Sequence, residues 1–204
     1  MGRPRRAAND EDAVSAEAAL LDAALGCFVA QGYHGTTMRD IAARARLAVS
    51  ASYYYFPAKL DLLRRLMVRV TEDLEAALSA AEREAGDMPA VRLAAVVRAH
   101  VLFHTHRRAE SFIGNSELRS LPPADRAEIV AMRDRIGAHF KRALEAGIRA
   151  RVFAIPDPQA AVLAIVTMCT AVATWYREDG PATPEQIADR YALLARRMVG
   201  AAER

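Results

Sequence analysis

The sequence predicts an all-α protein of about nine helices. Its 204 residues include only 10 Gly and 9 Pro, while alanine, leucine, arginine and glutamate, all good helix formers, are abundant. Apolar side chains recur at three- and four-residue steps, and no alternating pattern of a β-strand is evident. Hydrophobic residues make up 52% of the chain, which indicates a packed core and excludes a disordered protein.

The first part of the chain predicts three helices. They are expected, in order, over residues 15–31, 37–45 and 49–55. Ser15 is a suitable N-cap for the first, and Gly32 ends it because glycine tolerates the left-handed conformation found at helix C-termini. Thr36 or Thr37 caps the second helix. Pro57 cannot continue the third, so it separates that helix from the next.

The remaining helices are expected over residues 58–84, 89–108, 111–119, 124–150, 160–176 and 183–199. The first of these is long and carries apolar residues at helical spacing: Leu60, Leu63, Met67, Val70, Leu74 and Leu78. The last one has Thr183 as its cap and Pro184 at the first helical position. Its own apolar stripe is Ile187, Tyr191, Leu194 and Met198. Proline and glycine punctuate the boundaries between these helices.

The helix over residues 160–176 is apolar on nearly every side. It falls short of the roughly 20 residues that a membrane-spanning helix needs, and threonines interrupt it, so we expect no membrane span. A helix that is apolar all round must be buried all round. We therefore expect a second copy of the chain to cover one of its faces. The predicted homodimer forms through the last two helices, around residues 160–176 and 187–198.

Neither a metal centre nor a catalytic site is indicated. Cys27 and Cys169 lie in apolar helical runs, where core thiols are expected and a disulfide is not. His100 and His104 lie one turn apart but lack further ligands, so they are either ordinary histidines or polar groups lining a ligand cavity. The chain offers no glycine-rich phosphate loop and no nucleophile elbow, so we expect no enzyme and no cofactor. Its polar start lacks the apolar core of a secretory signal, which favours a cytoplasmic protein.

The segment TTMRDIAARARLAVSASYYYFPAK, residues 36–59, predicts a helix-turn-helix. In such a motif the second helix lays its N-terminal residues against base edges in the major groove. Val49, Ser50 and Ala51 occupy that position. Donors suited to binding phosphates surround them: Thr37, Arg39, Tyr53, Tyr54 and Lys59. The alternative is a small helical core in which Tyr53, Tyr55 and Phe56 pack, and for Tyr55 and Phe56 we favour it.

These residues resemble the TetR family of bacterial transcription regulators. The likeness covers about residues 15–62 and rests on Phe28, Gly32-Tyr33, Thr36-Thr37, Asp40-Ile41-Ala42, Ala45, Tyr53-Tyr54-Tyr55-Phe56 and Lys59. It implies a helix-turn-helix DNA-binding domain over residues 1–60 and a ligand-binding and dimerisation domain over residues 61–204. It also implies a dimeric repressor of a palindromic DNA operator. The family's DNA contacts map onto Tyr33, Thr37, Arg39, Val49, Ser50, Ala51, Tyr53, Tyr54 and Lys59.

The chain departs from the family pattern at the turn of the motif. Arg46 stands where a glycine is usual, Ala48 where a capping serine is usual, and Ser50 where a glycine is common. If Arg46 is left-handed, the strain costs about 1 kcal/mol relative to glycine. We hypothesise that Arg46 contacts a phosphate in return. Residues 1–12 are expected to form a flexible arm whose arginines, Arg3, Arg5 and Arg6, either follow the minor groove or merely add solubility.

The second domain offers candidates for a ligand pocket. Large apolar cavities with a few polar groups are typical of small-molecule sites. The candidates are Phe103, His104, Phe112, Asn115, Arg119, Met132, Phe140, Met168 and Trp175. The stretches FIGNSELRSL and TWYREDGPATPEQIADRY resemble acyl-CoA-responsive actinobacterial regulators of lipid and steroid breakdown, which implies a small apolar or acyl-CoA-type effector. The alternative is a constitutive or architectural DNA-binding protein without a ligand.

Overall fold

The all-α class is confirmed. The computed structural model describes residues 5–201, with side chains described from Val14 onward, and no strand occurs in that range. Three helices form the N-terminal part: α1 (Arg5–Gly35), α2 (Met38–Arg44) and α3 (Val49–Tyr55). The others are α4 (Lys59–Glu84), α5 (Pro89–His106), α6 (Arg108–Ser116), the 3-10 turn η1 (Leu118–Ser120), α7 (Pro123–Arg149), α8 (Pro158–Thr170), α9 (Val172–Trp175) and α10 (Pro184–Met198).

The first helix begins much earlier than its sequence caps suggest. It starts at Arg5 rather than Ser15, so residues 5–12, which were expected to form a flexible arm, are helical. Residues 5–15 contain several alanines and neither glycine nor proline, and alanine is the strongest helix former. A possible N-cap at Ser15 therefore does not stop the helix. The prediction for Arg3 lies outside the described residues. Gly32 adopts a φ of 76° as expected, and one further turn follows it.

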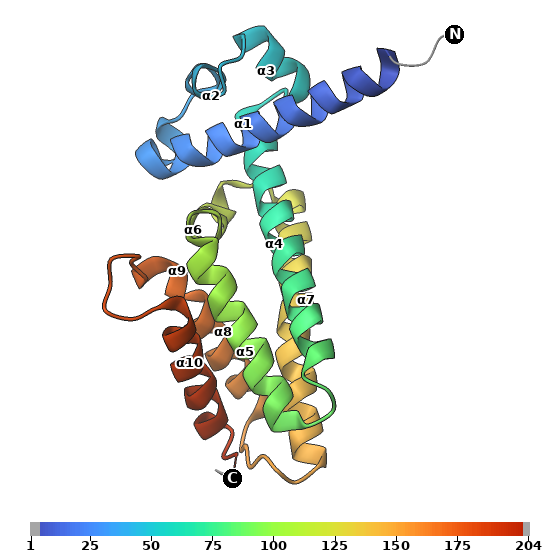
Figure 1. Ribbon diagram of the computed structural model, residues 1–204, viewed down its shortest axis with the longest axis vertical. Helices are drawn as coiled ribbons and strands as arrows, with labels where there is room; N and C mark the ends of the chain where they lie inside the picture. Colours follow the sequence, from blue (N-terminus) through green and yellow to red (C-terminus); the bar gives the residue numbers. More distant parts are fainter. Residues whose placement is uncertain (1–4, 202–204) are drawn as a thin grey trace.

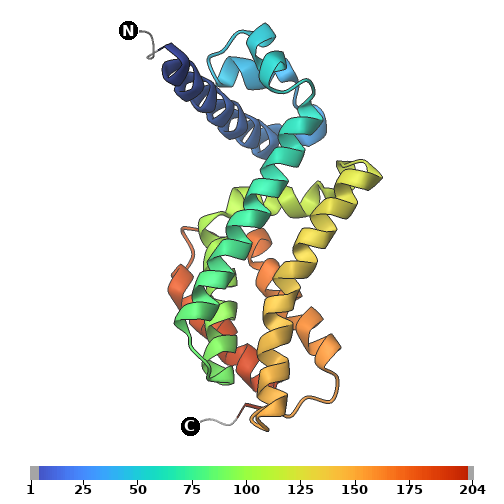
Figure 2. The ribbon, with the colours of Figure 1, turned by 90° about the vertical axis from the view of Figure 1, so that its right-hand side faces the viewer.

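The helices build an elongated molecule with α1, α2 and α3 at one end (Figure 1). The long helix α4 leaves this unit and runs down into a bundle with α5, α7, α8 and α10 (Figure 2). The apolar segment expected as one helix is divided into α8 and α9 at Ala171. Helix α6 ends before Arg119, which lies in η1. Helix α6 packs against α1, α4, α5 and α9, so it sits between the N-terminal unit and the bundle.

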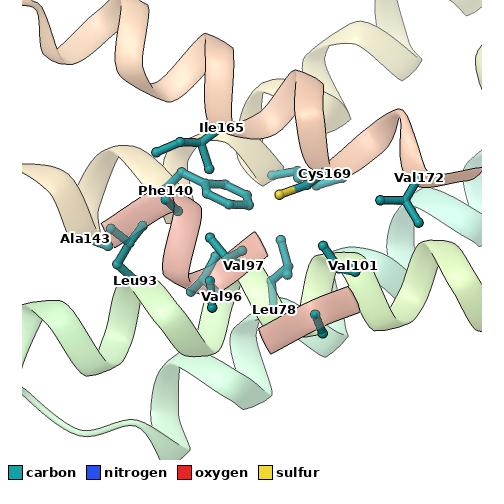
Figure 3. Packing of buried hydrophobic residues seen from close by; sticks show 14 of the residues in the cluster. Leu78, Leu93, Val96, Val97, Val101, Phe140, Ala143, Ile165, Cys169 and Val172 are labelled. Carbon is teal, nitrogen blue, oxygen red and sulfur yellow. The ribbon is translucent and has the colours of Figure 1, made fainter. Parts of the chain in front are cut away.

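Two apolar clusters hold the fold together. The bundle core includes Phe140, Ile165, Cys169, Val97 and Val101, which interdigitate between the facing helices (Figure 3). A second cluster, the bridging core, joins residues on both sides of the expected domain boundary at residue 60. It contains residues of α1, α2 and α4 together with Ile113 of α6, Leu121, and Ile129 and Met132 of α7. The bridging core therefore extends across the expected domain boundary.

By length and composition alone, two helical stretches are apolar enough to cross a membrane, Val14–Gly35 and Pro158–Trp175. Both take part in the packed interior, however. Leu20, Leu21, Ala24 and Phe28 of the first lie in the bridging core. Ile165, Cys169 and Val172 of the second lie in the bundle core. Core helices of soluble proteins pass the same test, so these stretches are weak evidence for a span.

Candidate functional site

Helix α2 is fixed at its start by a reciprocal cap. The Thr37 Oγ1 accepts from the Asp40 N–H at 3.2 Å, and the Asp40 carboxylate accepts from the Thr37 N–H at 2.9 Å. The Thr37 hydroxyl also donates to that carboxylate at 2.6 Å, and these hydrogen bonds lower the pKa of Asp40. This capping box sets where α2 begins. It also leaves Thr37 and Arg39 exposed at one end of the helix.

The turn between α2 and α3 passes through Arg46, which adopts a φ of 57°. The expected left-handed residue is therefore present, and it is not a glycine. Its N–H donates to the Ala43 carbonyl at 3.1 Å, and the Leu47 N–H donates to the Ala42 carbonyl at 2.9 Å. These bonds close the end of α2 in the manner of a glycine-terminated helix. The Arg46 side chain is exposed.

Replacing Arg46 by glycine tests this turn. We expect Arg46→Gly to raise the free energy of unfolding by up to about 1 kcal/mol, because glycine adopts positive φ without strain. If Arg46 binds a phosphate, DNA affinity falls and the salt dependence of binding loses about one unit of slope. The matched control is Arg151→Gly, because Arg151 has a φ of 55° beyond the end of α7. It should add stability and leave DNA binding unchanged. An unaltered salt slope in Arg46→Gly would show that Arg46 does not bind a phosphate.

The start of α3 presents small side chains to solvent. Val49 and Ser50 are exposed and Ala51 is half-buried, and Ala48 gives the helix no side-chain cap. Ser52 faces inward, with its hydroxyl donating to the Val49 carbonyl at 2.7 Å. Helix α3 therefore has one buried side and one exposed side, and the exposed side includes Val49 and Ser50 of its first turn.

The three consecutive tyrosines divide between surface and core. Tyr54 is 82% exposed and Tyr53 is 49% exposed, so neither is required for packing. Tyr55 is partly buried against the bridging core, and Phe56 lies within it. The packing interpretation is thus confirmed for Tyr55 and Phe56, and Tyr53 is a surface residue.

Tyr33 and Lys59 are tied to each other inside the protein. Tyr33 is buried in the bridging core. The Lys59 ammonium lies 4.3 Å from the centre of its ring and donates to the Tyr33 and Thr36 carbonyls, both at 2.6 Å. Burial lowers the pKa of Lys59. Lys59 therefore anchors the start of α4 to the end of α1, and only its remaining donor is available to a phosphate.

A cavity lies within the bundle. It has a volume of about 390 Å³ and is bounded by α4, α5, α6, α7, α8 and α9. Its apolar wall includes Val70, Leu74, Phe103, Ile136 and Val166. Its polar groups are Thr71, His100, His104, Ser111, Asn115, Arg133, Thr167, Thr170 and Thr174. An apolar cavity with a few polar groups is the usual form of a small-molecule site.

Three of the nine ligand-binding candidates line this cavity: Phe103, His104 and Asn115. The other six lie elsewhere. Met132 belongs to the bridging core, Phe140 and Met168 belong to or pack on the bundle core, and Phe112, Arg119 and Trp175 are exposed. Helical spacing alone does not separate a cavity wall from a filled core, which explains these differences.

The two cavity histidines are uncharged at neutral pH. Their rings stack at a centroid distance of 4.4 Å. Burial lowers the pKa of His104 to about 4 and holds the pKa of His100 well below its usual range. The His104 Nδ1 lies 2.9 Å from the His100 carbonyl oxygen. Because a carbonyl only accepts, the proton of His104 sits on Nδ1 and its Nε2 is an acceptor.

Sequence reasoning missed Arg133, the cationic group of the cavity. Arg133 is half-buried on α7 and donates to the Gly114 carbonyl of α6 at 2.8 Å. Burial lowers the pKa of its guanidinium. A signal was present in the sequence, because Arg133 interrupts the inward stripe formed by Ile129, Ile136 and Phe140. A charged residue at such a position is rare unless it has a partner or a function.

The part of the chain that the structure describes contains no group of three His, Cys, Asp or Glu residues able to hold a metal ion. Cys27 and Cys169 are both buried free thiols. Burial raises the pKa of Cys169 to about 12, which keeps that thiol protonated and unreactive.

Comparison with known families gives two matches. Residues 20–66 match the family described as bacterial regulatory proteins, tetR family. Residues 86–199 match a tetracyclin repressor-like C-terminal domain.

Individual proteins also resemble the chain. It is 39% identical over 83 residues to the HTH-type transcriptional regulator BetI of Burkholderia mallei, covering 41% of this chain and 43% of BetI. The chain thus spans less than half the length of that curated relative. A tetR-family regulatory protein from Rhodococcus RHA1 is 36% identical with a TM-score of 0.88, covering 92% of this chain and 98% of that protein. AibR, solved with isovaleryl coenzyme A and operator DNA, is 24% identical with a TM-score of 0.81, covering 92% of this chain and 100% of AibR.

Proposed function

Because the chain belongs to the TetR family of DNA-binding transcriptional regulators, we propose that it is a repressor that binds a palindromic operator as a dimer and leaves it when a small effector binds. The family and fold are those of regulators rather than enzymes, and a regulator of this kind works in the cytoplasm. The observation that carries the proposal is the free first turn of α3, with Val49 and Ser50 exposed in a helix-turn-helix at one end of the molecule.

The proposed DNA-binding surface combines residues that contact base edges with residues that bind phosphates. Val49, Ser50 and Ala51 face the base edges, where small side chains contact thymine methyl groups or form single hydrogen bonds. The exposed phosphate-binding residues around them are Thr37, Arg39, Arg46, Tyr53 and Tyr54. Since the reading residues carry few donors, sequence recognition relies in part on DNA shape and bridging water. Tyr33 and Lys59 support this surface from the inside.

The dimer interface is placed on the outer faces of α8 and α10. Helix α10 buries Ala188, Ala192 and Ala195 against the bundle and presents Leu194 and Met198 to solvent, 47% and 44% exposed. The outer face of the α8–α9 segment adds Leu163 and Trp175, which are 68% and 48% exposed. Apolar surface of this kind on a helix pair suits a symmetric interface. A dimer places two recognition helices about 34–36 Å apart, one turn of DNA.

Helix α6 connects the effector cavity to the DNA-binding unit. Its residues Ser111, Gly114 and Asn115 line the cavity, while Ile113, on another side of the same helix, lies in the bridging core with residues of α1 and α4. A ligand that displaces α6 must therefore disturb the packing that positions α1 and α4. Packed interiors respond to such shifts by moving helices as units, which changes the spacing of the recognition helices.

The proposed effector is a small apolar or acyl-CoA-type compound. AibR is described as binding isovaleryl coenzyme A, and its similarity to this chain shows the fold alone. The cavity volume of about 390 Å³ lies near the lower end of the roughly 300–1,000 Å³ typical of ligand sites. It suits a small apolar body or the acyl part of a thioester, with any larger group lying outside.

A charge placed on α3 tests DNA binding. An operator is first selected from a pool of random DNA duplexes, and a palindrome is expected. Ser50→Asp should then lower affinity at least about tenfold, because a carboxylate in the groove meets the phosphates and acceptor base edges. The matched control is Ala127→Asp, an exposed position on α7. If both variants bind as the wild type does, α3 is not the reading helix.

An effector screen tests the switch. Thermal-shift measurements with acyl-CoAs and apolar compounds identify ligands, and operator binding is repeated with each hit. A ligand that raises the melting temperature and releases the operator supports the repressor. Ligands that bind without changing operator affinity would contradict the switch, and the constitutive alternative would follow.

A further inference from the structure

We propose that the effector cavity takes an apolar ligand bearing one carboxylate, and that Arg133 binds this carboxylate. The inference rests on the proposed function, because it assigns the ligand class of the same cavity. It goes beyond that function because it names the charge of the ligand and the residue that recognises it.

Arg133 carries a charge in the wall of the cavity. A guanidinium stays protonated under physiological conditions, even where burial lowers its pKa. Among residues 14–201, whose side chains the structure describes, no carboxylate forms an ion pair with Arg133, and its hydrogen bond goes to the Gly114 carbonyl. Buried charges are normally paired. An arginine in a cavity wall without a carboxylate partner indicates that the ligand supplies the anionic group.

No other group among the described residues of the cavity lining carries a charge. His100 and His104 are neutral, because burial lowers both pKa values, His104 further lowers that of His100, and Arg133 further lowers that of His104. The other polar groups are hydroxyls and an amide. Nothing in the lining competes with Arg133 for an anion or repels one. The planar guanidinium also matches a carboxylate through paired hydrogen bonds.

The cavity that Arg133 lines also holds unsatisfied polar atoms. The Ser111 hydroxyl and the His100 Nδ1 are buried without a hydrogen-bond partner among the described residues. Both residues line the cavity and are at least nine-tenths buried. Buried polar atoms normally have partners. The Ser111 hydroxyl can donate to the same carboxylate, and the rest of the lining is largely apolar, which suits the hydrocarbon part of the ligand.

The contact also explains how such a ligand would act on α6. Arg133 holds the Gly114 carbonyl of α6 by a hydrogen bond of 2.8 Å. A carboxylate is a stronger acceptor for a guanidinium than a carbonyl is. Its arrival draws the guanidinium toward the ligand and loosens the link between α7 and α6. The charged group of the ligand is therefore the part that changes the helix packing.

Matched pairs of compounds test the assignment directly. The probes are butanoate, hexanoate, octanoate, decanoate and phenylacetate, each with its primary amide, which keeps the shape and removes the charge. Binding is measured by calorimetry at neutral pH. We expect at least one acid to bind at least about tenfold more tightly than its amide. In Arg133→Gln, which keeps a donor for Gly114, the ratio should fall close to one, and Arg133→Lys should retain part of it.

Several outcomes overturn the proposal. They are equal binding of acids and amides by the wild type, an unchanged ratio in Arg133→Gln, and no binding by any acid. Melting curves of the two variants check that both fold. Operator release is measured separately, so the two hypotheses fail differently. A neutral compound that binds and releases DNA supports the effector-controlled switch and contradicts the carboxylate assignment. An acid that binds through Arg133 without releasing DNA supports the carboxylate assignment and contradicts the switch.

Discussion

Replacing Lys59 by methionine is expected to lower the free energy of unfolding by about 2–3 kcal/mol and to abolish operator binding. The Lys59 ammonium donates to the Tyr33 and Thr36 carbonyls, both at 2.6 Å, and lies over the Tyr33 ring. Hydrogen bonds from a charged donor contribute about 1.5–3 kcal/mol each, and partial exposure reduces the sum. Without them α1 and α4 lose their connection next to the helix-turn-helix. Urea unfolding and DNA-binding anisotropy measure the two effects.

The control is Lys141→Met, because Lys141 is exposed on α7 and pairs only loosely with Glu145 at 3.9 Å. It should change stability by less than about 0.5 kcal/mol. The variant also separates two roles of Lys59. A residue that acts only on a phosphate would leave stability intact and reduce the salt slope of binding by about one unit. That pattern would contradict the anchoring role.

The second large effect is expected on acidification. His104 has a pKa of about 4 in the folded protein and about 6.5 when unfolded. The unfolded chain therefore binds more protons between these values, and the free energy of unfolding falls as pH drops from 6.5 toward 4. The loss from His104 alone reaches about 3 kcal/mol. His100, whose pKa is lowered further by burial, acts in the same direction.

The groups that face His104 are His100 on its own helix and Arg133 on α7, and the Arg133 charge further lowers the pKa of His104. In His104→Asn the amide still donates to the His100 carbonyl, but it does not titrate. Urea unfolding at a series of pH values should show a shallower loss of stability for this variant. His106→Asn is the control, since His106 is exposed on the same helix. If the free energy of unfolding falls equally with pH in the wild type and in His104→Asn, His104 does not cause the loss of stability.

The DNA-binding unit was predictable because its determinants are local. The bounds of α3, the Thr37 cap and the left-handed residues Gly32 and Arg46 all follow from propensities and turn geometry acting over a few residues. The predicted start of α1 was wrong because it relied on one local signal, the cap residue Ser15. A cap residue such as Ser15 permits a helix start, and a run of helix formers before it makes the start unnecessary. The phosphate and base contacts themselves remain predictions.

The cavity was only partly predictable, because it depends on packing between distant helices. Phe103, His104 and Asn115 lie on the side of α5 and α6 that meets the hollow. Phe140 has the same composition-level features and fills the core beside them. The crossing of α5, α7 and α8 decides which of these residues line the cavity and which fill the core, and no local pattern specifies that crossing. Arg133 was the exception, because a charged residue in an apolar stripe is visible in the sequence.

The bridging core sets a limit on modular engineering of this protein. Ile113, Leu121, Ile129 and Met132 belong to the same apolar cluster as residues of the N-terminal helices. A chimera that transfers residues 1–60 onto another regulator would bring half of an interior and leave its complement behind. The graft would expose apolar surface or bury it against mismatched side chains. DNA specificity in such hybrids is better exchanged by replacing the exposed residues of α2 and α3, which the interior does not use.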